Sequence, residues 1–159
     1  MDKRTEDILF KSGLILAGYF LILKPVLNRF GITKSAEDIA NEKADQKRIE
    51  DKIKSEKLLQ KQTKTDAEWQ IIADQIYQDL RYTAIDDKKD DAVYQAARVK
   101  NDTDFWILYK LFGKRQEYAF FFPIGDKQDL PQMLRSNLSL SQINIINDNY
   151  RRKNMKSRI

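Results

Sequence analysis

Apolar residues follow three different patterns along this chain. A nearly unbroken apolar run covers residues 12–23 and is followed, from residue 32 to 64, by a stretch rich in charge. From residue 65 onward, apolar residues return at helical spacing. The pattern predicts an all-α protein with a transmembrane anchor helix at 1–31, a charged tether at 32–64, a small helical domain at 65–150 and a basic tail at 151–159.

The apolar run between Lys11 and Lys24 is the strongest local signal. As a helix, residues 12–23 alone would reach only about 18 Å, short of the ~30 Å hydrocarbon thickness of a bilayer. With Thr5 as N-cap and Gly31 as the stop, the helix would reach about 39 Å, and its lysines could extend to the headgroups. We therefore predict a single-pass membrane anchor, with Lys11, Lys24 and Arg29 at the interfaces and, in contact with lipid, Leu14, Ile15, Leu16, Tyr19, Phe20, Leu21, Ile22 and Leu23.

Two other interpretations of this run remain open, a cleaved signal peptide and a helix buried in protein. Cleavage is disfavoured because no small-x-small site follows Leu23. Basic residues are balanced on the two sides of the run, so charge does not predict the orientation in the bilayer.

The predicted tether contains no aromatic residue and few large apolar ones from Ser35 to Lys64. Ile39, Ile49 and Ile53 do not continue a heptad, so a coiled coil is not indicated. Such a stretch is typical of a spacer, either a solvated helix or a disordered segment.

Five short helices are expected between residues 65 and 150. Their starts are indicated by Thr65 with Glu68, the acidic cluster at 86–91, Asn101 or Asp102, Asp129 before Pro131, and Ser139 or Ser141. Gly113 should end the third helix. The side chains expected to face the core are Trp69, Ile72, Ala73, Ile76, Tyr77, Leu80, Ala92, Val93, Ala96, Val99, Phe105, Leu108, Tyr109, Phe112, Leu130, Met133, Leu134, Leu138, Leu140, Ile143, Ile146 and Tyr150.

A dense aromatic run, Tyr118–Pro123, lies between the predicted helices. One interpretation is core filling by a loop or short strand, with at least two of the rings buried, since a small domain needs large apolar side chains. The other is an exposed partner-binding patch made of Phe120, Phe121 and Phe122.

The carboxyl-terminal residues 151–159 hold five basic residues and no acidic one, so the rest of the chain is neutral in formal charge. Such a tail could bind anionic lipid or packaged nucleic acid, without sequence specificity, or be a solvated end. The residues that would bind an anionic surface are Arg151, Arg152, Lys153, Lys156 and Arg158.

Composition narrows the chemistry, because the chain has neither cysteine nor histidine. Thiolate and imidazole ligands are absent, as are imidazole bases and disulfides. The acidic clusters at 86–91 and 102–104 lack EF-hand spacing and are better explained as helix-capping residues. We expect a non-enzymatic binding protein with no metal and no cofactor.

The order of helix signals resembles a degenerate annexin-type helical repeat over about residues 80 to 150. The resemblance is carried by Ile85-Asp86-Asp87, Tyr109–Gly113, Asp129-Leu130 and Leu134–Ser139. The chain is also similar to small proteins of phages infecting Bacteroidetes-like hosts, in which a membrane helix and a polar tether carry one such repeat. The resemblance implies a minor virion component that joins a virion or host inner membrane to a capsid protein. Glycines of the annexin calcium loop are missing near Asp86, so calcium binding is not carried over.

Overall fold

A computed structural model describes residues 36–81, 88–119 and 122–159 of the chain. The predicted anchor at 1–31, including the apolar run, lies outside these residues. In the ranges described, no helix combines the length and the apolar character that crossing a bilayer requires.

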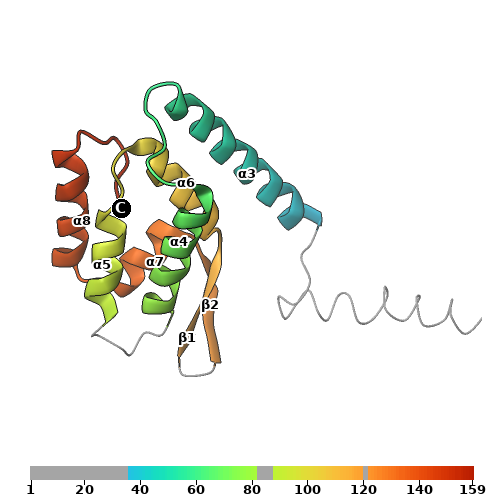
Figure 1. Cartoon of the computed structure of the whole chain (residues 1–159). Helices are drawn as coiled ribbons and strands as arrows, with labels where there is room; N and C mark the ends of the chain where they lie inside the picture. Colours follow the sequence, from blue (N-terminus) through green and yellow to red (C-terminus); the bar gives the residue numbers. More distant parts are fainter. Residues whose placement is uncertain (1–35, 82–87, 120–121) are drawn as a thin grey trace, which may run out of the picture. The chain divides into compact units, whose positions relative to one another are not determined.

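The described residues form six helices and one β-hairpin (Figure 1). A mainly helical fold with a small carboxyl-terminal helical domain is therefore confirmed. The prediction of an all-α chain is wrong at one place, the antiparallel pair β1–β2. The element bounds are α3 Ala36–Lys57, α4 Asp66–Leu80, α5 Lys89–Ala97, α6 Asp102–Phe112, β1 Arg115–Ala119, β2 Phe122–Gln128, α7 Leu130–Asn137 and α8 Leu140–Arg152.

Most helix starts lie where capping residues predicted them. Capping boxes begin α4 at Thr65, α7 at Asp129 and α8 at Ser139. Asn101 caps α6 by accepting a hydrogen bond from the Asp104 amide, and Gly113, at a φ of 62°, ends that helix. These side chains satisfy amides that have no partner inside the helix, which is why short polar residues mark helix starts so clearly.

The core is centred on α4, which packs against α5, α6 and α7, while α5 packs against α8. Tyr150 on α8 is fully buried, donates a hydrogen bond to the Ala96 carbonyl at 3.0 Å and meets the Phe105 ring edge to face. Nearly all the predicted core residues are buried or packed against the core. The prediction that Leu140 faces the core is wrong. Leu140 is the first residue of α8 and is 76% exposed, whereas Ile143 and Ile146 further along the helix are buried.

The predicted tether is helical over α3, and its last part belongs to the folded unit. Contacts divide the chain into residues 1–46 and 47–159. Within the second unit Ile53 is buried, Ile49 packs against the core, and the Lys110 ammonium lies 3.0 Å from the Glu50 carboxylate. Ile49 and Ile53, in the last turns of α3, thus pack with the helical domain although both lie in the stretch expected to be a tether.

Candidate binding surfaces

The unpredicted hairpin is the first candidate surface. β1 and β2 pair Glu117 with Ile124 and Ala119 with Phe122, and the register shifts between Arg115 and Glu117. Aromatic residues favour extended backbone, but the short run at 118–123 shows no alternation that would have identified a strand. The pairing therefore depends on contacts with distant helices.

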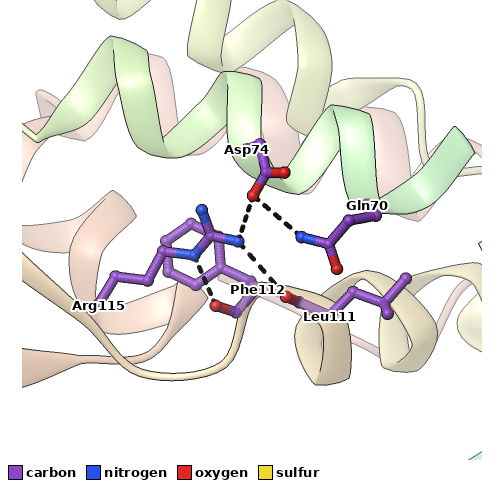
Figure 2. Close-up of polar contacts among 5 residues, drawn as sticks. All are labelled: Gln70, Asp74, Leu111, Phe112 and Arg115. Atoms are coloured by element: carbon purple, nitrogen blue, oxygen red, sulfur yellow. Dashed lines mark hydrogen bonds and ion pairs between the residues drawn. The ribbon is translucent and has the colours of Figure 1, made fainter. Parts of the chain in front are cut away.

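Arg115 fixes the start of the hairpin on two helices (Figure 2). Its guanidinium donates to the Phe112 carbonyl at 2.7 Å and to the Asp74 carboxylate of α4 at 2.7 Å. The same guanidinium lies 4.8 Å from the Phe112 ring centre and 5.0 Å from that of Tyr77. Gln70 adds a second hydrogen bond to Asp74 at 2.9 Å. Arg115 thus caps the end of α6 and links it to α4, with its guanidinium close to two aromatic rings.

Three further contacts hold β1 in place. The Tyr77 hydroxyl donates to the Gln116 carbonyl at 3.0 Å, and the Tyr118 amide donates to the Arg81 carbonyl at 2.8 Å. Glu117 is buried and accepts a hydrogen bond from Gln128 at 3.0 Å across the hairpin. β1 is accordingly joined by hydrogen bonds to α4 and to the end of α6.

Arg115→Lys should lower the free energy of unfolding by about 1.5 kcal/mol, because lysine keeps the charge but loses the planar fork and the stacking. Urea denaturation of the full chain, followed by circular dichroism, measures this change. Arg135→Lys is the matched control, since Arg135 is exposed on α7. Equal losses in the two variants would contradict the role assigned to Arg115.

Only one of the three phenylalanines of the predicted patch can be placed. Phe122 begins β2 and is 75% exposed, whereas Phe120 and Phe121 lie outside the described residues. Pro123 next to it is also exposed. The hairpin therefore displays a large apolar side chain on a strand paired with β1, an arrangement typical of a binding anchor.

The carboxyl-terminal segment is not a free tail, which corrects the expectation of a solvated end. Arg151 and Arg152 are still part of α8, and Met155 and Ile159 are buried. The Ile159 amide donates to the Asn147 side chain at 2.9 Å. The segment folds back because two apolar side chains and several backbone amides find partners in the domain.

Of the five basic residues expected to bind anions, Arg151 pairs with Asp148 and Arg158 donates to backbone carbonyls, and Lys153 contacts the end of another helix. Its ammonium donates to the carbonyls of Ala97 and Val99 at 2.6 and 2.7 Å, at the end of α5. Burial and the nearby charge of Lys100 lower the pKa of Lys153. Lys153 is therefore a structural cap, whereas Arg151, Arg152, Lys156 and Arg158 are exposed.

Two buried aspartates at the start of α6 hold the chain's distant segments together. Asp102 accepts hydrogen bonds from the amides of Lys156 and Ser157 and from the Ser157 hydroxyl, at 2.6 to 3.0 Å. Asp104 accepts from the Thr63 amide at 2.9 Å and from its hydroxyl at 2.7 Å. The acidic pair predicted to cap α6 thus binds segments on either side of the domain.

Hydrogen bonds decide the ionisation of Asp102. Burial by itself raises the pKa of this carboxyl, but the Ser157 hydroxyl and the amides of Lys156 and Ser157, helped by the charge of Lys156, lower the pKa by more. The net pKa of Asp102 lies below its ordinary value. Asp102 is consequently a carboxylate acceptor in the folded protein.

The same contacts bring the backbone of three lysine-bearing segments together at the start of α6, which no sequence pattern indicated. The Asn101 side chain donates to the Lys61 carbonyl at 2.9 Å, and the Lys156 amide lies 2.9 Å from Asp102. Lys100 is close enough to Lys153 to lower its pKa. No local signal could have revealed this cluster, because its members are up to 95 positions apart in the sequence.

A shallow open hollow of about 470 Å³ lies between the end of β2 and α7. Residues of both charges line it, with Asp126, Lys127, Gln132 and Arg135 among them. Across the part of the chain covered by the structure, histidine, cysteine and acidic side chains form no group able to hold a metal ion. The surfaces with the clearest chemistry are therefore the aromatic hairpin and the lysine cluster.

No protein-family model matches the chain, and no curated protein or solved structure matches it. The resemblance to an annexin-type repeat stays a prediction.

Proposed function

We propose that this protein is a non-enzymatic, membrane-anchored adaptor, a minor virion component that links a bilayer to a capsid protein. In this proposal the run at 12–23 spans the membrane, and the helical domain binds the capsid protein through its hairpin. The observation that carries the binding role is Phe122, 75% exposed on a hairpin that Arg115 fixes to α4 and α6.

The anchor is supported by the sequence alone, since the run joins apolar residues on both sides of its lysines. Leu16→Arg with Leu21→Arg places two charges in the centre of the run, each costing about 2.5 to 3.5 kcal/mol of insertion free energy. We expect the double variant to leave the carbonate-resistant membrane fraction, measured by fractionation of cells expressing the full chain.

The matched control makes the same two substitutions elsewhere. Leu58 and Leu59 are 87% and 69% exposed at the end of α3, so Leu58→Arg with Leu59→Arg should leave membrane association unchanged. Membrane association that survives in the Leu16→Arg, Leu21→Arg variant, or is lost equally in both, would contradict the anchor.

The capsid-binding end is proposed to be the hairpin because burying one phenylalanine on binding contributes about 1.5 to 3 kcal/mol. Pairing of β2 with β1 lowers the conformational entropy that is lost when the partner binds. The phage context follows from the resemblance given above, and its support is the order of the anchor, tether and helical domain.

Phe122→Ser should reduce co-purification of the protein with virus particles by about tenfold or more, and should change the domain's stability little, because the side chain is exposed. The measurement is immunoblotting of particles purified from the native source of the chain. Tyr94→Ser removes another exposed aromatic, 64% exposed on α5, and should have no such effect. Particles that lack the wild-type protein, or that retain both variants equally, would contradict the adaptor role.

A further inference from the structure

The lysine cluster at the start of α6 has a charge pattern that the adaptor role does not use. It joins three segments, residues 60–64, 97–104 and 151–158, through the side chains of Asn101, Asp102 and Asp104. Together these segments contain nine basic and two acidic residues, a formal charge of +7. Since the whole chain is +5, all the remaining residues sum to −2, so positive charge is concentrated in this part of the fold.

The two acidic residues within the cluster form no ion pair with its exposed lysines among the described residues. Asp102 and Asp104 are 2% and 0% exposed, and they accept hydrogen bonds from amides and hydroxyls. For the residues described here, the structure records no ion pair at Lys61, Lys100 or Lys156. The exposed lysines are thus accessible to external anions, whereas the two aspartates are buried.

We propose that this basic face, defined by Lys61, Lys100 and Lys156, lies on the anionic headgroups of a phospholipid bilayer. The choice of a bilayer rests on the proposed function, because an anchor in the same chain keeps the domain near headgroups. Lysines are compact point charges without a fixed fork, and each contributes about 1 kcal/mol of attraction near an anionic surface. They belong to three separate backbone segments that meet at the start of α6, so their proximity depends on the fold and not on a flexible tail.

The test uses the full chain carrying Leu16→Arg and Leu21→Arg, so that insertion of the anchor does not mask surface binding. Flotation with vesicles of phosphatidylcholine alone or with about 30% phosphatidylserine measures the bound fraction, at roughly 0.05 and 0.5 M salt. We expect about fivefold more binding to the anionic vesicles at low salt, and loss of that difference at high salt.

Neutralising the basic face with Lys61→Gln, Lys100→Gln and Lys156→Gln should lower binding to anionic vesicles about tenfold. The control variant, Lys47→Gln, Lys52→Gln and Lys127→Gln, has the same net charge but changes exposed lysines elsewhere. It should stay within about twofold of the parent. Circular dichroism checks that each variant is folded. If the triple variant is unfolded, the double variant Lys61→Gln with Lys100→Gln replaces it in the binding measurement.

Three results would overturn the proposal. One is equal binding to neutral and anionic vesicles, and another is equal loss in both triple variants, which would mean that net charge alone acts. The third is displacement of the protein from vesicles by duplex DNA at equal phosphate concentration, because the basic face would then bind nucleic acid. An anchor that fails in the carbonate test leaves salt-sensitive binding to anionic vesicles intact, so the two proposals fail separately.

Discussion

Trp69→Ala should lower the free energy of unfolding by about 4 kcal/mol, the largest effect expected from a single substitution in this domain. Trp69 is 0% exposed on α4, the helix that packs against α5, α6 and α7. Removing its indole leaves a cavity that three neighbouring helices can close only in part. Urea denaturation followed by circular dichroism measures the loss, which is a large share of the 5 to 15 kcal/mol typical of a domain.

Two further variants separate burial from the other properties of Trp69. Ile71→Ala lies two residues away on the same helix, but Ile71 is 69% exposed, so the change should be below about 0.5 kcal/mol. Trp69→Phe keeps much of the volume and removes the indole N–H, which has no hydrogen-bond partner among the described residues. Trp69→Phe should lower the free energy of unfolding clearly less than Trp69→Ala does. Similar losses for Trp69→Ala and Ile71→Ala would show that the packing of α4 differs from this structure.

Asp102→Ala should lower the free energy of unfolding by about 3 kcal/mol, because it leaves several donors without their acceptor. The amides of Lys156 and Ser157 and the Ser157 hydroxyl all point at this carboxylate. Loss of Asp102 should also release the carboxyl-terminal segment. Hydrogen exchange of the amides at 154–159 should become faster by more than tenfold, while α4 keeps its relative protection.

Asp148→Ala is the matched control for this prediction. Asp148 is an acidic residue of α8 whose carboxylate forms a surface ion pair with Arg151 at 2.8 Å. Exposed pairs contribute little, so the free energy of unfolding should change by less than about 1 kcal/mol. Protection of residues 154–159 that persists in the Asp102→Ala variant would contradict the proposed hydrogen-bond hub.

The lowered pKa of Asp102 predicts how the free energy of unfolding changes as the pH falls. A carboxyl whose pKa is lower in the folded than in the unfolded state stabilises the fold above its unfolded pKa of about 3.9. That contribution is lost as the pH falls through the lower, folded-state pKa. Wild-type stability should therefore decrease below about pH 4 more steeply than the stability of Asp102→Ala. Burial raises the pKa of Asp79, which acts in the opposite sense, so the difference between the two proteins is the quantity to measure.

Helix positions and most of the core could be predicted from the sequence because both depend on neighbouring residues. Thr65, Asn101 and Ser139 were identified as caps because a short polar side chain can reach an amide two or three residues away. The periodic positions on α4 and α6 were identified because helical spacing places them on one face. Leu140 shows the limit of this reasoning, since its periodicity is correct but no neighbouring element covers it.

The hairpin could not be predicted, because no local pattern in residues 115–128 specifies a strand pair. Its position depends on Arg115, whose partners include Asp74, 41 residues away, and on the Tyr77 hydroxyl. The exposure of Phe122 is equally a tertiary property, since the aromatic run was compatible with both a buried and an exposed ring. Fixation by distant side chains is what turns this run into a candidate binding surface.

The sequence by itself determined the helices, their caps, the periodic core and the apolar run proposed as an anchor, because these depend on spacing along the chain. Only the tertiary structure decided that Lys153 caps α5 and that residues 151–159 are docked instead of free. It also decided that the segments carrying Lys61, Lys100 and Lys156 come together at the start of α6. The physical reason is that a carboxylate can accept several hydrogen bonds. Local spacing predicted Asp102 and Asp104 as helix caps, but the Thr63 and Ser157 amides that also donate to them come near only when the chain folds.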